Sequence, residues 1–197
     1  MKLTDIVSAN QIEAERIMTI CNSCRYCEGH CAVFPAMEKR IEFEKPDLEY
    51  LANLCHNCGS CYHHCQYADP HEFQINVPQT FSDLRHETYA TYAFPSFMGK
   101  VFENNGMWAT TLTVLSFIVM FALYGGTNSN VTTFYDVIPH NWMVNTFGSV
   151  GIFVFFALVA GIVRYWRALS LPSPFDLNWG HIITGVKQAL TLKYLDG

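Results

Sequence analysis

Charged residues are missing from two long stretches of this sequence. No Asp, Glu, Lys or Arg occurs in residues 104–135 or 137–163, although charged residues make up 15% of the 197-residue chain. Apolar segments occupy residues 107–124 and 142–163 of these stretches. As helices they would be about 27 Å and about 33 Å long, enough to cross a bilayer core of roughly 30 Å. We therefore predict two transmembrane helices.

The alternative for these segments is a pair of buried helices in a soluble core. Gly148, Gly151 and Gly161 lower the helix propensity of the second segment in water, but small residues are common where membrane helices approach closely. The ends of both segments also carry aromatic residues, as helices do at a membrane interface. These residues are Trp108, Tyr124, Trp142, Tyr165 and Trp166. The flanks therefore favour the membrane over a soluble core.

Basic residues are absent between the two predicted spans. Residues 125–141 contain no Lys or Arg, whereas Lys100 precedes the first span and Arg164 and Arg167 follow the second. Cytoplasmic loops carry the excess of basic residues in membrane proteins. We therefore expect a multi-pass protein with both termini in the cytoplasm.

The sequence also lacks the marks of several function classes. It has no G-x-G-x-x-G, so no dinucleotide or flavin fingerprint can be placed and a substrate-oxidising subunit must be another chain. A net charge of −5 without a basic stripe gives no indication of nucleic-acid binding. Residues 1–10 lack the basic start and apolar core of a secretory signal, which argues against disulfides.

Histidine is absent from both apolar segments. Haem in a membrane bundle is usually held by histidines that face each other within the helices, so haem b would require further helices than these. Four histidines instead cluster around residues 55–71, where we expect hydrogen bonding to cluster sulfur or backbone rather than metal ligation. They are His56, His63, His64 and His71.

All eight cysteines fall into two copies of one pattern, C-x2-C-x2-C-x3-C. Ferredoxins hold two iron–sulfur clusters with this pattern: the first three cysteines bind one cube and the fourth reaches the other. We therefore predict two [4Fe–4S] clusters with crossed ligands. One cluster is expected on Cys21, Cys24, Cys27 and Cys65, and the other on Cys55, Cys58, Cys61 and Cys31.

Zinc is the alternative reading of the cysteines, but structural zinc uses ligand pairs separated by a longer stretch. The pattern also departs from small bacterial ferredoxins, because Ala32 and Gln66 stand where a proline follows the fourth cysteine. The charged stretch between the copies has apolar residues at helical spacing, at Leu48, Leu51 and Leu54. A helical ferredoxin module followed by two transmembrane helices is therefore the expected, mainly α fold.

Helical patterns also flank the cysteine motifs and the spans. We predict a helix capped by Asn10 and Glu13 that leads into Cys21, and another starting near Pro78 with Phe81, Leu84 and Tyr89 on one side. After a break at residues 171–174, an amphipathic helix follows that could rest on lipid or pack against the ferredoxin module. Its apolar residues are Trp179, Ile182, Ile183, Val186 and Leu190. The expected domains are residues 1–95, 96–167 and 168–197.

Three segments resemble the tricarballylate-utilization protein B family, also called CitB-type citrate-utilization proteins. They are CNSCRYCEGHCAVFPAMEKR, LANLCHNCGSCYHHCQYADPHEF and INVPQTFSDLRHETYATYAFP. The resemblance covers the whole chain and is sharpest over residues 18–95, where the cysteines match the family's two cluster motifs. Family members run longer, so the resemblance implies a C-terminally shortened version.

The resemblance implies an electron-transfer component of an oxidoreductase in the cytoplasmic membrane of a bacterium, rather than a stand-alone enzyme. Such a protein reoxidises an FAD-dependent tricarballylate or citrate-related dehydrogenase and passes electrons to the quinone pool. A quinone would most simply dock at the end of the second span, at Arg164, Tyr165, Trp166 and Arg167; the alternative, which the residue types favour, is that they are ordinary interfacial anchors. The alternatives are a succinate, glycolate or heterodisulfide system, or an iron–sulfur sensor or structural protein without turnover.

Overall fold

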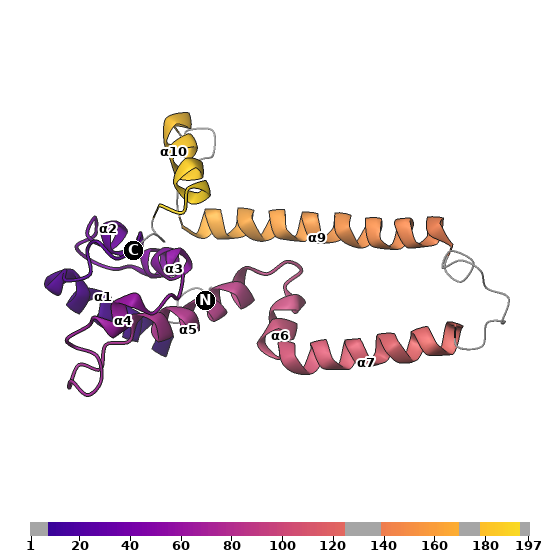
Figure 1. The fold of residues 1–197 in the computed structure, drawn as a ribbon, viewed down its shortest axis with the longest axis horizontal. Coiled ribbons are helices and arrows are strands. Elements are labelled where there is room, and N and C mark those ends of the chain that lie inside the picture. The colour runs from indigo at the N-terminus through magenta and orange to yellow at the C-terminus, as the bar shows by residue number, and fades with distance from the viewer. Residues whose placement is uncertain (1–7, 125–138, 170–177, 194–197) are drawn as a thin grey trace, which may run out of the picture. The chain divides into compact units, whose positions relative to one another are not determined.

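The protein was described from a computed structural model, which covers residues 8–124, 139–169 and 178–193 (Figure 1). Within these ranges the ordered elements are all helices, as predicted. The helices are α1 (Ala9–Cys24), α2 (Val33–Met37), α3 (Lys45–Leu54), α4 (Ser60–His63), α5 (Val77–Tyr92), α6 (Phe97–Glu103), α7 (Asn105–Tyr124), α9 (His140–Ala168) and α10 (Trp179–Leu190).

The chain divides into two compact units. One unit contains Met1–Thr88 together with Trp166–Gly197, and the other contains Tyr89–Tyr165. The expected domain boundaries at residues 95 and 167 stay predictions.

The core of the first unit is formed by one face each of α1, α2, α3 and α5. Ile17 and Met18 of α1, Leu51 of α3, and Phe81 and Leu84 of α5 are all at most 1% exposed. Burial of side chains of this size stabilises the fold by about 1.5–3 kcal/mol each, before the cost in conformational entropy. The helix predicted from the spacing of Leu48 and Leu51 is α3, and it buries both.

The helix that leads into the first cysteine motif does not begin as predicted. Ser8 caps α1: its Oγ accepts the Gln11 backbone N–H at 3.1 Å, and its own N–H donates to Gln11 Oε1 at 3.2 Å. Asn10 instead donates to Glu87 Oε1 at 2.7 Å, and Glu13 pairs with Arg16. The expected cap of Asn10 and Glu13 is therefore wrong, because contacts elsewhere take up both side chains.

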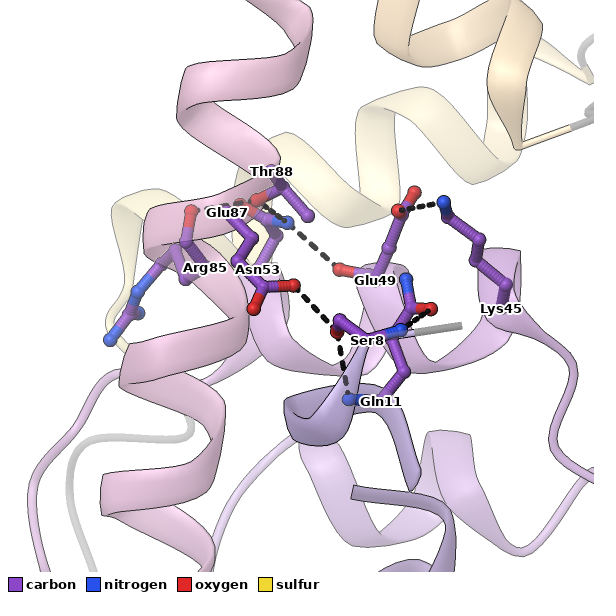
Figure 2. Close-up of polar contacts among 8 residues, drawn as sticks. All are labelled: Ser8, Gln11, Lys45, Glu49, Asn53, Arg85, Glu87 and Thr88. Atoms are coloured by element: carbon purple, nitrogen blue, oxygen red, sulfur yellow. Dashed lines mark hydrogen bonds and ion pairs between the residues drawn. The ribbon is translucent and has the colours of Figure 1, made fainter. Parts of the chain in front are cut away.

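Polar contacts join α5 to α1 and α3 at one end of this core (Figure 2). Ser8 Oγ donates to Glu87 Oε2 at 2.8 Å, and Asn53 Nδ2 donates to Thr88 Oγ1 at 3.2 Å. Thr88 is 3% exposed and lies on the buried face of α5, whereas Tyr89, which the sequence placed there, is 53% exposed. These hydrogen bonds fix the position of α5 beside the cysteine loops.

The second unit contains the two long apolar helices. Residues Asn105–Ala122 of α7 and His140–Ala168 of α9 are long and apolar enough to cross a membrane, and none of these residues is buried inside the protein. The second helix is longer than the predicted span and continues through Arg164 and Arg167. The predicted connection at residues 125–138 lies outside the described residues.

The amphipathic helix predicted near the C-terminus is present as α10. Its apolar residues stay on the surface, with Trp179, Ile183 and Leu190 each at least 65% exposed. The choice between lipid and protein for this face stays open. The break predicted at residues 171–174 lies outside the described residues.

Candidate functional site

The eight cysteines line two separate cavities in the first unit. The first cavity is open to the surface and takes three thiols from the first motif and one from the second. Its cysteines are Cys21, Cys24, Cys27 and Cys65. The second cavity takes three thiols from the second motif and one from the first. Its cysteines are Cys55, Cys58, Cys61 and Cys31.

This division matches the crossed grouping that the spacing predicts, although it does not show what the cysteines bind. Helix α1 ends at Cys24, and Arg25 follows in the left-handed conformation with φ 53°, which turns the chain away from the helix axis. Cys31 lies just before α2, beyond that turn, and contributes to the other cavity. The helix end therefore separates the fourth cysteine from the first three.

A left-handed glycine shapes the second motif. Gly59 has φ 77° and is the N-cap of α4, the single turn that carries Cys61. An added side chain would be strained in this conformation whatever the space around it, so glycine is required for the turn. The turn places Cys58 and Cys61 on the wall of one cavity.

The remaining walls of both cavities are largely apolar. Ile20, Tyr67 and Ile75 line the first, and Val33 and Val77 line the second. Phe34 lines both cavities and is only 2% exposed, so a single buried ring lies on the wall that they share.

The acid–base properties of the thiols suit cations as partners. Burial raises the pKa of Cys21 to about 12 and that of Cys61 to about 12, and the sulfurs of neighbouring cysteines act in the same direction. Burial likewise raises the pKa of Cys27 to about 11. A thiolate is the form that ligates metal, and such clustered thiolates require positive charge to offset their burial and mutual repulsion. Four thiols per cavity therefore fit the chemistry of an iron–sulfur cube.

Among the residues that the structure describes, no group of three or more His, Cys, Asp or Glu side chains could hold a metal ion.

Histidines lie near the second cavity, as the sequence indicated, but His30 was not singled out. His30 and His56 both line the cavity. The His30 and His64 rings meet edge to face at 5.2 Å between centroids, and His64 Nδ1 lies 2.9 Å from the Ser60 carbonyl oxygen. His71 Nδ1 accepts the Phe73 N–H at 3.1 Å. His64 and His71 thus contact backbone, one of the roles expected for these histidines.

Arg85 was missed by the sequence reasoning. It projects from α5, and its Nη1 donates to the Cys55 carbonyl oxygen at 2.5 Å. No motif contains it, because its partner lies 30 residues away. The one signal available was a basic residue on the helix predicted to start near Pro78.

The residues expected to contact quinone are partly engaged within the second unit. Arg164 Nη1 donates to the Ala93 carbonyl oxygen at 2.9 Å and to Ser96 Oγ at 3.3 Å, and its guanidinium lies 4.9 Å from the centre of the Phe94 ring. The Tyr165 ring contacts Tyr92 at 5.4 Å. Arg164 therefore ties α9 to residues 93–96, and quinone contact at Arg164, Tyr165, Trp166 and Arg167 stays a prediction.

Comparison with known proteins finds relatives along nearly the whole chain. The family profile of the citrate utilization protein B Fer4-like domain matches residues 14–91, and that of citrate utilization protein B matches residues 101–197. The citrate utilization protein B of Escherichia coli is 46% identical over 98% of this chain. The chain spans about half of that protein, covering 52% of its length. No solved structure matches the chain.

Proposed function

The chain belongs to the citrate utilization protein B family, and from this premise we propose that it is a membrane-anchored iron–sulfur electron carrier. It accepts electrons from the reduced flavin of a partner FAD-dependent dehydrogenase for tricarballylate or a related citrate compound, and delivers them to membrane quinone. The observation that carries the proposal is the sorting of eight cysteines into two cavities of four.

Each part of the chain has a defined task in this proposal. The thiols of Cys21, Cys24, Cys27 and Cys65 hold one [4Fe–4S] cluster, and those of Cys31, Cys55, Cys58 and Cys61 hold the other. Bound there, the clusters supply one-electron steps between a two-electron flavin and the acceptor. The apolar cavity walls limit water around the sulfurs, and the Phe34 side chain lines both sites.

The membrane part of the proposal depends on α7 and α9. Both are long enough to span a bilayer, and both leave large apolar side chains such as Phe121 and Phe156 more than 60% exposed. Contiguous exposed apolar surface of this kind requires a partner such as lipid. We therefore propose that the spans lie in the cytoplasmic membrane, where quinone is dissolved. The basic residues Lys100, Arg164 and Arg167 that flank the spans support a cysteine domain on the cytoplasmic side.

The first test is iron and acid-labile sulfide content together with low-temperature EPR, on protein purified anaerobically in detergent. We expect about eight irons and about eight sulfides per chain, and coupled signals from two reduced clusters after dithionite. Stoichiometric zinc without sulfide in protein never exposed to air would contradict the proposal.

A second measurement separates a carrier from a sensor or structural protein. Photoreduced FAD serves as electron donor and a water-soluble ubiquinone analogue as acceptor, and the cluster signals are followed by stopped-flow absorbance. A carrier is reduced by the flavin and reoxidised by the quinone. Clusters that assemble but exchange electrons with neither reagent would favour the sensor or structural role.

A further inference from the structure

The two cavities differ in the positive charge and hydrogen-bond donors around their cysteines. Arg85 does not line the second cavity, but its Nη1 donates to the carbonyl oxygen of Cys55, which does, at 2.5 Å, and the Asn57 N–H donates to Cys55 Sγ at 3.4 Å. A cation and an N–H donor thus both meet the same cysteine. Arg85 is half-buried, so water screens its charge less than at an exposed site.

The position of Arg85 is fixed by the packing of α5. Thr88 Oγ1 donates to the Arg85 carbonyl oxygen at 2.8 Å, and Asn53 of α3 donates to the same Thr88 hydroxyl (Figure 2). Leu84, the preceding residue, is completely buried. The guanidinium therefore extends from a backbone held at several points.

The pKa shifts of the second cavity reflect these donors. Burial raises the pKa of Cys55, while the Asn57 N–H and the Arg85 charge oppose the rise. Burial also raises the pKa of Cys31, and the backbone N–H groups of Val33 and Phe34 oppose it.

The first cavity has fewer such groups. Within the described residues, its cysteines receive one side-chain hydrogen bond, from Gln66 Nε2 to Cys24 Sγ at a long 3.8 Å. Burial and the sulfurs of neighbouring cysteines raise the pKa of Cys21. In the part of the chain that the structure describes, no Lys or Arg side chain donates to these four cysteines, and Arg25, which follows Cys24, donates to the Asn22 carbonyl oxygen at 3.0 Å.

A cluster gains one unit of negative charge when one electron reduces it. Nearby cations and N–H donors to sulfur stabilise that form and raise the reduction potential. We propose that Arg85 and the N–H donor at Cys55 make the second cavity the site of higher potential, so that a single electron shared by the two clusters settles there. Arg85 acts through Cys55 as a positioning residue, and the inference builds on the proposed carrier function.

The test is an EPR-monitored redox titration of the full chain in detergent, with dithionite as reductant. The unmodified protein is expected to show two midpoint potentials. Arg85→Gln should lower the higher potential and leave the lower one unchanged, and Arg85→Lys, which keeps the charge, should restore most of the loss. Arg16→Gln is the matched control, because this exposed arginine pairs with Glu13 on α1 and should move neither potential.

A second variant keeps the test decisive if Arg85→Gln fails to assemble clusters. Gln66→Leu removes the donor to Cys24 and should lower only the lower potential. The inference is overturned if Gln66→Leu moves the higher potential, or if Arg85→Gln moves the lower one or neither. Failure of the carrier function is distinct from these results, since it would appear as protein without iron and sulfide.

Discussion

Replacing cysteines by serine in pairs tests whether each cavity takes ligands from both motifs. The structure places Cys21 and Cys65 on one cavity, although they belong to different motifs. Cys21→Ser with Cys65→Ser would therefore disable the first cavity and leave the four thiols of the second complete. Cys21→Ser with Cys31→Ser instead removes one thiol from each cavity.

The expected magnitudes follow from the count of intact cavities. A complete cavity holds four irons, so the protein with eight intact cysteines should contain about eight irons per chain. The Cys21 and Cys65 variant should keep about four irons as one intact cube. Its reduced EPR signal should lose the splitting that arises from a second reduced cluster nearby. The Cys21 and Cys31 variant should keep no cube with four cysteine ligands.

The assay is iron and sulfide analysis with EPR of anaerobically purified protein, and circular dichroism at 222 nm verifies the helical content of each variant. The matched control, Cys31→Ser with Cys55→Ser, disables only the second cavity and should also retain one intact cube. The reasoning would be refuted by the opposite pattern, in which the Cys21 and Cys31 variant retains one intact four-iron cluster and the Cys21 and Cys65 variant retains none.

Three further predictions concern stability. Leu84→Ala should destabilise the first unit by about 2–5 kcal/mol, because Leu84 is fully buried, with a clear fall in the thermal midpoint; the exposed Gln79→Ala on the same helix should change it little. The pKa of Cys21 is about 12 against a usual 9.0, so the folded chain keeps a proton that the unfolded chain releases. Iron-free protein should thus be most stable below about pH 9 and lose stability toward pH 12. Cys21→Ala should reduce this loss in thermal melts across that range, and a thermal midpoint that falls with pH as steeply as in the unmodified protein would contradict the prediction. Arg164→Met should cost about 1–3 kcal/mol and speed hydrogen exchange at residues 93–99, since it removes the bond to Ala93, whereas the exposed Arg167→Met should leave exchange there unaltered.

Regular spacing made the helices and the sorting of the cysteines predictable. The cysteines of each motif are three or four residues apart, and Leu48 and Leu51 in α3 are three residues apart, so both patterns are visible within a short segment of sequence. Long uncharged segments likewise indicated α7 and α9 without any knowledge of their neighbours. These features depend on nearby residues in the chain, which is why sequence alone conveys them.

Contacts between distant residues account for what the sequence did not reveal. Asn10 has the side chain of a good helix cap, but Glu87, 77 residues away, binds it instead. Tyr89 was expected on the buried face of α5. Thr88 lies there instead, where its hydroxyl accepts a hydrogen bond from the Asn53 side chain of α3. Arg85 was overlooked for the same reason, since nothing near it in the chain indicates that it reaches Cys55.

Because each cavity takes cysteines from both motifs, neither cavity can be completed before the second motif has been synthesised. The second cavity needs Cys61 and the first needs Cys65, so neither is complete when only residues 1–54 have left the ribosome. Translation of the next eleven residues, Cys55 to Cys65, then completes both cavities almost together. A nascent chain stalled within those residues would expose reactive thiols without a full site, and a chain divided between the motifs would leave each fragment with three thiols per cavity at most.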